Sequence, residues 1–222
     1  MTPLLVLGDS HGEVFRRPLF GARFPDHAWE TVIVPGATAS GLENPNDSKT
    51  QAYPTFKRAL GATAARRVIV SLGEVDTGFV IWYRARKYQE PVFAMLDRAV
   101  EAYVRFLGEI AADFDVLCIS TPLPTIPDGT TWGEVANLRK EVQASQLART
   151  ALTLEFNRRV RLRSAGLGVC YLSLDAVSLG LDGLVKPELL NARQSDHHYE
   201  PDRYAALIAD RLPPFLARPE RT

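Results

Sequence analysis

Five short apolar runs alternate along the chain with longer segments in which apolar residues recur at helical spacing. Runs that are apolar throughout are typical of strands buried on both faces of a parallel sheet, and parallel strands need crossover helices between them. The runs cover residues 4–7, 31–34, 68–72, 116–120 and 169–172. This alternation predicts a three-layer α/β/α sandwich around a doubly wound parallel sheet of about five strands.

The segments between the runs supply the helices that this fold requires. A length of 222 residues suits one domain of this type, so we predict a single domain over residues 1–222. Residues 121–131 form a loop rich in Pro, Thr and Gly at the ligand-binding edge of the sheet. The predicted helical segments are residues 14–20, interrupted by Pro18, and residues 53–60, 79–88, 91–112, 134–164 and 202–216.

Charge and cysteine content exclude several classes of protein. The 26 Lys and Arg residues balance the 26 Asp and Glu residues, which argues against nucleic acid and membrane surfaces as partners. No segment has the ~20 apolar residues of a membrane span, and the N-terminus lacks the pattern of a signal peptide, so we predict a cytoplasmic protein. Two cysteines cannot form a disulfide scaffold, and Cys118 and Cys170 are predicted to be buried thiols on strands.

Residues that can carry chemistry follow three of the predicted strands. The first run leads into Gly8-Asp9-Ser10-His11, the second is followed by Gly36, and the third by Gly73-Glu74-Val75-Asp76. The carboxyl ends of parallel strands lie at one edge of the sheet, so these turns are expected to converge. His197-His198 precedes the last predicted helix, which gives a nucleophile-then-base order known from serine hydrolases.

These four blocks resemble those of the SGNH/GDSL hydrolase superfamily, and the resemblance extends over most of the chain. It implies an SGNH/flavodoxin-like sandwich, Ser10 as nucleophile, and backbone N–H groups of Ser10 and Gly36 as oxyanion donors. It also implies that no cofactor is needed. In the family a tyrosine stands six residues after the catalytic histidine, and the spacing to Tyr204 selects His198 over His197.

The sequence departs from the family pattern at two positions. Val75 stands where the family has an asparagine that donates to the oxyanion, and valine has no donor. Ser195 stands where the family has its aspartate, three residues before the histidine. Asp196, two residues before His198, is therefore the predicted third member of the triad, provided that a short loop lets it reach Nδ1.

Further polar residues are predicted to line the substrate site. Asp76 could instead have a structural role, as the cap of the segment that follows the third strand. Glu74 could bind a substrate hydroxyl or amine, or pair with one of the basic residues that follow it. The residues predicted to bind substrate are Glu74, Asp76, His11 and His197, and the possible partners of Glu74 are Arg84, Arg86 and Lys87.

We predict no metal, because a zinc site needs three or four convergent ligands. Its possible members are His11, His197, His198, Asp9 and Asp196.

The sequence therefore predicts a serine esterase or deacylase that acts on a small-molecule or carbohydrate ester through an acyl-enzyme. Three alternatives stay open at this point. An acyltransferase would use the same residues with a different acceptor, and a non-hydrolytic binding or assembly domain would fit the altered motifs. Both are conceivable in glycan or surface-polymer biosynthesis. The third alternative is a metal-dependent hydrolase. The sequence makes no prediction of the oligomeric state.

Overall fold

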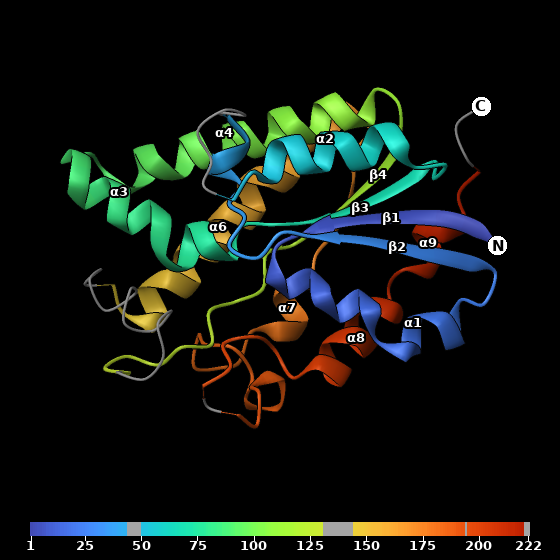
Figure 1. Cartoon of the computed structure of the whole chain (residues 1–222). Helices are drawn as coiled ribbons and strands as arrows, with labels where there is room; N and C mark the ends of the chain where they lie inside the picture. Colours follow the sequence, from blue (N-terminus) through green and yellow to red (C-terminus); the bar gives the residue numbers. More distant parts are fainter. Residues whose placement is uncertain (44–49, 131–143, 194, 220–222) are drawn as a thin grey trace.

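A computed structural model describes residues 1–43, 50–130, 144–193 and 195–219. Its five strands pair in parallel in the order β2-β1-β3-β4-β5, with β1 and β3 near the middle of the sheet (Figure 1). The reversal of strand order beside β1 makes the sheet doubly wound, as predicted. The strands are β1 (Thr2–Gly8), β2 (His27–Ile33), β3 (Arg67–Ser71), β4 (Asp115–Ile119) and β5 (Cys170–Leu172).

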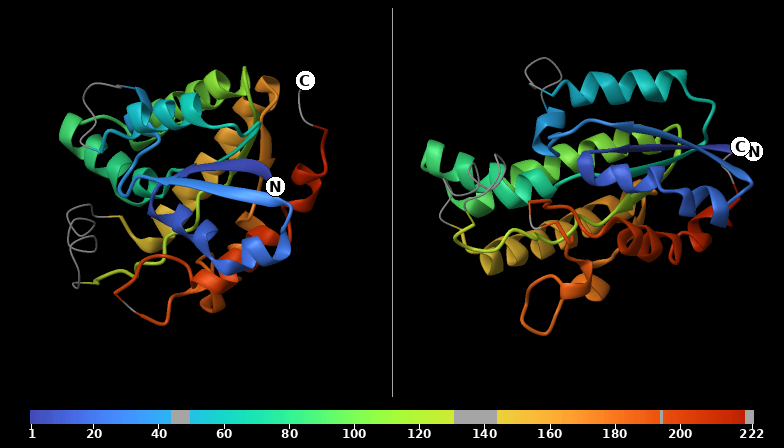
Figure 2. Two further views of the ribbon diagram at one scale, coloured as in Figure 1. Left: turned by 45° about the vertical axis from the view of Figure 1, so that its right-hand side comes forward. Right: turned by 60° about the horizontal axis from the view of Figure 1, so that its bottom comes forward.

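Helices cover both faces of the sheet, which confirms the three-layer sandwich (Figures 1 and 2). One layer holds α2 (Ala52–Ala62), α3 (Ile81–Tyr88), α4 (Val92–Ala111) and α6 (Gln146–Ser164). The other holds α1 (Pro18–Arg23), α7 (Asp175–Ser178), α8 (Pro201–Ala209) and α9 (Pro213–Leu216). Shorter helices are the 3₁₀ helices η1 (Ser10–Arg16), η2 (Ser40–Glu43), η4 (Ala165–Leu167) and η5 (Pro187–Leu189), and a π-helical turn, η3 (Asp76–Val80).

The central strands bury both faces because successive side chains point to opposite sides of a strand. In β1, Leu5 and Leu7 enter the apolar core beneath α2 and α4. Leu4 and Val6 enter the second core, beneath η1 and α8. All four are at most 1% exposed, so the uninterrupted apolar run reports two separate cores.

The edge strands correct one prediction. Residues of β2 and β5 are mostly half-buried, because each edge strand has one neighbour only. Cys170 on β5 is accordingly half-buried, not buried as predicted, whereas Cys118 on the inner strand β4 is buried. Burial raises the pKa of the Cys118 thiol to about 12, so this thiol stays protonated and unreactive at neutral pH.

Three predicted helices differ from the observed ones. The predicted helix 14–20 is divided between η1, which ends at Arg16, and α1, which begins at Pro18. The predicted helix 202–216 is two helices, α8 and α9, because Pro213 and Pro214 cannot donate the N–H bonds that would continue α8. Of the predicted segment 134–164, residues 134–143 lie outside the described residues, and α6 accounts for the part from Gln146. Within the described part of the chain, no helix has both the length and the apolar character needed to cross a membrane.

Candidate active site

The turn after β1 places Ser10 at the carboxyl edge of the sheet. A Cβ at Gly8 would lie 3.0 Å from the carbonyl oxygen of Ser71, so a side chain would be crowded at this position. Asp9 caps η1: its carboxylate accepts a hydrogen bond from the backbone N–H of His11 at 2.9 Å. Asp9 therefore has a structural role as the cap of η1. Ser10 is the first residue of η1 and is half-buried.

The loop before α8 brings His198 to Ser10. Nε2 of His198 lies 2.8 Å from Oγ of Ser10. His197, its neighbour in the sequence, packs its ring against that of His198, with the ring centroids 4.2 Å apart. Ser10 and His198 are 188 positions apart in the sequence, so their contact depends on the parallel sheet and on the packing of α8 beside η1.

Asp196 completes the chain of contacts despite its altered spacing. Its Oδ1 lies 2.6 Å from Nδ1 of His198 and also accepts the backbone N–H of His198 at 3.0 Å. Because one oxygen contacts both groups, the chain turns back on itself within two residues. A separation of two residues is thus enough for an aspartate to reach the imidazole.

The surroundings keep the imidazole of His198 neutral. Burial and the nearby charge of His11 lower the pKa of His198, while Asp196 and Glu74 act in the opposite direction. Partial burial would raise the pKa of Asp196, but hydrogen bonds from the backbone and ring of His198 outweigh it and hold that pKa low. An ionised aspartate beside a neutral imidazole is the state in which histidine can accept a proton from serine.

The loop after β4 supports the histidine loop. The hydroxyl of Thr125 donates to the backbone carbonyl of His197, and the backbone N–H of Leu123 donates to the hydroxyl of Tyr199 at 2.8 Å. Most of the described part of this loop is buried. Its sequence predicts a loop at the ligand-binding edge of the sheet, but it does not predict these contacts with the histidine loop. The pairing could not be found from sequence because its partners lie more than 70 positions apart.

The turn after β3 packs tightly at Gly73. With φ of +119°, Gly73 has a backbone that other residues rarely adopt. A Cβ here would lie 2.5 Å from Oγ1 of Thr121 and 2.8 Å from the ring of Phe156. Both the backbone conformation and the lack of space for a Cβ therefore require glycine at position 73.

The carboxylate of Asp76 faces the backbone of the loop after β2. One oxygen accepts the N–H of Ala39 at 2.6 Å and the other accepts the N–H of Ser40 at 3.1 Å. Asp76 is fully buried, and burial raises its pKa although these hydrogen bonds act against the shift. The contact fastens the loop that carries Gly36, whose φ of +73° is left-handed.

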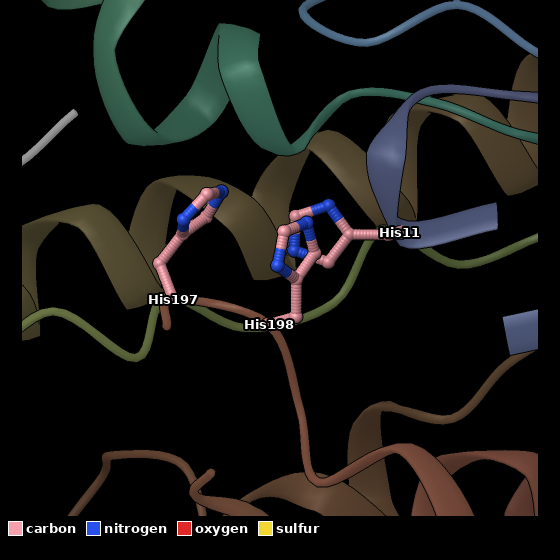
Figure 3. Close-up of side chains that lie close together, drawn as sticks. All are labelled: His11, His197 and His198. Carbon is pink, nitrogen blue, oxygen red and sulfur yellow. The ribbon is translucent and has the colours of Figure 1, made fainter. Parts of the chain in front are cut away.

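Glu74, His11 and His197 lie around His198. Glu74 is 2% exposed, and its charge acts on the imidazole of His198. The ring centroids of His11 and His197 lie 4.5 Å and 4.2 Å from that of His198 (Figure 3). One ring nitrogen of each of the three histidines lies within 4.8 Å of those of the other two, so together they could hold a metal ion.

A cleft of about 480 Å³ opens beside Ser10 and His198. This volume is in the range of small-molecule sites. Ion pairs at its rim neutralise its two arginines, because Arg16 contacts Glu13 and Arg17 contacts Asp202. The cleft is lined by Ser10, His11, Glu13, Val14, Arg16, Arg17, Pro18, Asp196, His198, Tyr199, Pro201 and Tyr204.

The strand order and the position of Ser10 after β1 define a doubly wound α/β sandwich with a polar turn at the carboxyl edge of the sheet, which is the fold that the resemblance in the sequence implies. No family model matches the chain, and no curated protein matches its sequence. The fold is therefore identified through solved structures.

Three of these structures illustrate the likeness. A carbohydrate acetylesterase from Sinorhizobium meliloti is 16% identical with a TM-score of 0.62, over 97% of this chain and 100% of that one. An acetyl xylan esterase, AlAXEase, is 10% identical with a TM-score of 0.59, over 94% and 96% of the two chains. A GDSL-like lipase from Bacteroides thetaiotaomicron is 11% identical with a TM-score of 0.56, over 94% and 86%.

Proposed function

We propose that this protein is a serine esterase that removes the acyl group from a small ester, with an acylated carbohydrate as the candidate substrate. The observation that carries the proposal is the unbroken chain of contacts from Ser10 through His198 to Asp196, with distances of 2.8 Å and 2.6 Å. A neutral imidazole between a hydroxyl and a carboxylate is the arrangement that activates a serine.

In the first half of the reaction, Oγ of Ser10 attacks the ester carbonyl carbon while Nε2 of His198 takes the hydroxyl proton. Asp196 holds the ring through Nδ1 and stabilises the imidazolium that forms. When the tetrahedral intermediate collapses, the bond to the alcohol oxygen breaks. His198 returns its proton to that oxygen, and the alcohol leaves an acyl group on Ser10.

In the second half, water adds to the acyl-enzyme with His198 as base. Collapse of this second intermediate releases the carboxylic acid and restores the hydroxyl of Ser10. Acyl transfer to a sugar hydroxyl would follow the same steps with that hydroxyl in place of water.

The oxyanion of both intermediates would be held by backbone N–H groups of Ser10 and Gly36. Val75 supplies no third donor from the turn after β3, and loss of one such donor costs roughly 10²–10³ in turnover. The proposal therefore includes slow hydrolysis of generic activated esters.

The choice of a carbohydrate ester depends on the cleft and on the structural neighbours. A space of about 480 Å³ is suited to an acylated sugar unit or a similarly small alcohol. Two of the neighbours are described as acetylesterases of carbohydrate or xylan. The charge of Glu74, which is 2% exposed and acts electrostatically on His198, would disfavour acidic substrates at a distance rather than by contact.

Hydrolysis of p-nitrophenyl acetate and of a peracetylated monosaccharide tests the proposal. The wild-type protein should release acetate from both, Ser10→Ala should lose the activity, and prior removal of metals with EDTA should leave it intact. Activity that persists in Ser10→Ala but disappears with EDTA would identify a metal-dependent hydrolase. A folded protein with no activity on either ester would favour a binding domain.

A further inference from the structure

Three of the four histidines of this chain meet beside the nucleophile, although the serine mechanism uses one of them. His11 comes from η1, at the end of β1, and His197 and His198 come from the loop before α8 (Figure 3). One ring nitrogen of each lies within 4.8 Å of those of the other two. The fourth histidine, His27, lies on β2 outside this group.

Two of these imidazoles are backed by carboxylates. Oδ1 of Asp9 lies 3.2 Å from Nδ1 of His11, and Oδ1 of Asp196 lies 2.6 Å from Nδ1 of His198. A carboxylate on one ring nitrogen orients a histidine and makes its other nitrogen a better metal ligand. Because a carboxylate contacts Nδ1 of each of these two rings, Nε2 is the nitrogen that each would offer to a shared ion, and the carboxylates would balance the charge of that ion.

The set of three imidazoles matches the needs of a zinc-type ion. Zn²⁺ takes nitrogen ligands at about 2.0–2.1 Å in tetrahedral geometry, and three protein ligands leave one position open. Such ligands lie about 3.3 Å from one another, so ring nitrogens that lie within 4.8 Å here need to close by at most about 1.5 Å. Imidazole also suits Cu²⁺ and Ni²⁺, whereas Mg²⁺ and Ca²⁺ prefer oxygen.

We propose that His11, His197 and His198 form a binding site for a divalent transition metal such as Zn²⁺, and that the bound ion inhibits the esterase. The inhibitory part rests on the function proposed above. The ion occupies the lone pair of Nε2 of His198, which otherwise accepts the proton of Ser10. The serine then loses its base, and chelation of the ion restores it.

Isothermal titration of the metal-free protein with ZnCl₂ tests the site without any use of its activity. Ser10→Ala keeps all three histidines and should bind one Zn²⁺ per chain. Adding His197→Ala to this background should weaken binding by at least about tenfold, and Asp9→Asn should weaken it by roughly 10–100-fold. His27→Asn is the matched control and should keep the affinity of its parent. Equal affinity in the parent and in both His197→Ala and His11→Ala proteins would overturn the site.

Esterase assays at increasing ZnCl₂ test the inhibition, with each variant compared with its own metal-free rate. Activity of the wild type should fall at least tenfold at saturating Zn²⁺ and return with EDTA, and His197→Ala should need more Zn²⁺ for the same loss. Binding without loss of activity, or activation by Zn²⁺, would refute the inhibition. If Zn²⁺ binds while the metal-free protein has no serine-dependent activity, the proposed function fails and the metal site stands.

Discussion

The molecule contains the same Asp-x-His arrangement twice, at Asp9–His11 and at Asp196–His198. In both, one aspartate Oδ1 accepts the backbone N–H of the histidine two residues on, at 2.9 Å and 3.0 Å, and contacts its Nδ1. The first pair lies in the turn after β1, with both side chains 2% exposed. The second lies in a loop, with its side chains 29% and 35% exposed.

Local geometry therefore does not decide which pair serves as base and orienting acid. The structure places Nε2 of His198 2.8 Å from Oγ of Ser10, whereas His11 follows Ser10 directly on η1. Side chains of adjacent residues at the beginning of a helix point in different directions. The loop before α8 comes from another part of the fold, so its histidine can face the hydroxyl of Ser10. The comparison teaches that the catalytic pair is selected by topology.

Removal of each imidazole in turn should produce the largest difference between the two pairs. His198→Ala should lower kcat by at least about 10⁴-fold, since Ser10 loses its base. His11→Ala should lower it far less, through the packing and charge around His198. Steady-state rates on p-nitrophenyl acetate measure both. A larger loss in His11→Ala would reverse the assignment.

The two aspartates should separate catalysis from stability. Asp196→Asn should lower kcat by roughly 10²–10⁴-fold with a small effect on folding, because it disturbs the orientation and tautomer of His198. Asp9→Asn should cost about 1–3 kcal/mol of unfolding free energy, because it weakens the hydrogen bond that the charged carboxylate accepts from the backbone of His11 and buries an amide N–H donor. Urea denaturation and kcat, measured on both variants, should show opposite rankings, and the same ranking in both would contradict this division.

The turn after β3 can be tested by restoring the amide donor that Val75 lacks. Val75→Asn restores the amide donor that the family has at this position, so hydrolysis of generic esters should rise by up to roughly 10²-fold. The same substitution should lower the native reaction if the site is specialised away from simple esters. Glu74→Gln should then relax discrimination against acidic substrates. If neither variant changes rate or selectivity, the turn after β3 does not contact substrate.

The pH profile gives the smallest effect and still distinguishes the pairs. Catalysis needs neutral His198, whose pKa is lowered below 6.5 by burial and by His11. The profile of kcat/KM should therefore rise with a midpoint below 6.5 and be flat at neutral pH. His11→Asn should move this midpoint upward, because it removes a lowering charge. Asp196→Asn should move it downward, because Asp196 raises the pKa.

The fold could be predicted from sequence because its strongest signal, uninterrupted apolar runs between helical segments, reports burial on both faces directly. The sequence overestimates the burial of the edge strands, because an apolar run such as 169–172 does not show that its strand has only one neighbour in the sheet. Pro213 and Pro214 mark the division between α8 and α9, but the apolar residues keep their helical spacing across it, and this spacing alone predicts one helix.

The candidate site could be predicted in part. The order of the blocks pointed to Ser10 and His198, since parallel strands align their turns at one edge. The sequence names His11, His197 and His198 as possible convergent ligands, but only the structure shows that they meet. The use of Asp76 by the backbone of Ala39 and Ser40 could not be predicted, because it depends on loops packing across the sheet edge.

Labelling with a fluorophosphonate tests the central claim, that the Ser10–His198 contact activates Ser10 as a nucleophile. The reagent forms a stable adduct with an activated serine and leaves an unactivated one unmodified. Peptide mass spectrometry of the metal-free protein should show one adduct, on Ser10. The adduct should be absent in Ser10→Ala and form much more slowly in His198→Ala. An unlabelled Ser10 in folded protein, or equal labelling in His198→Ala, would contradict the account.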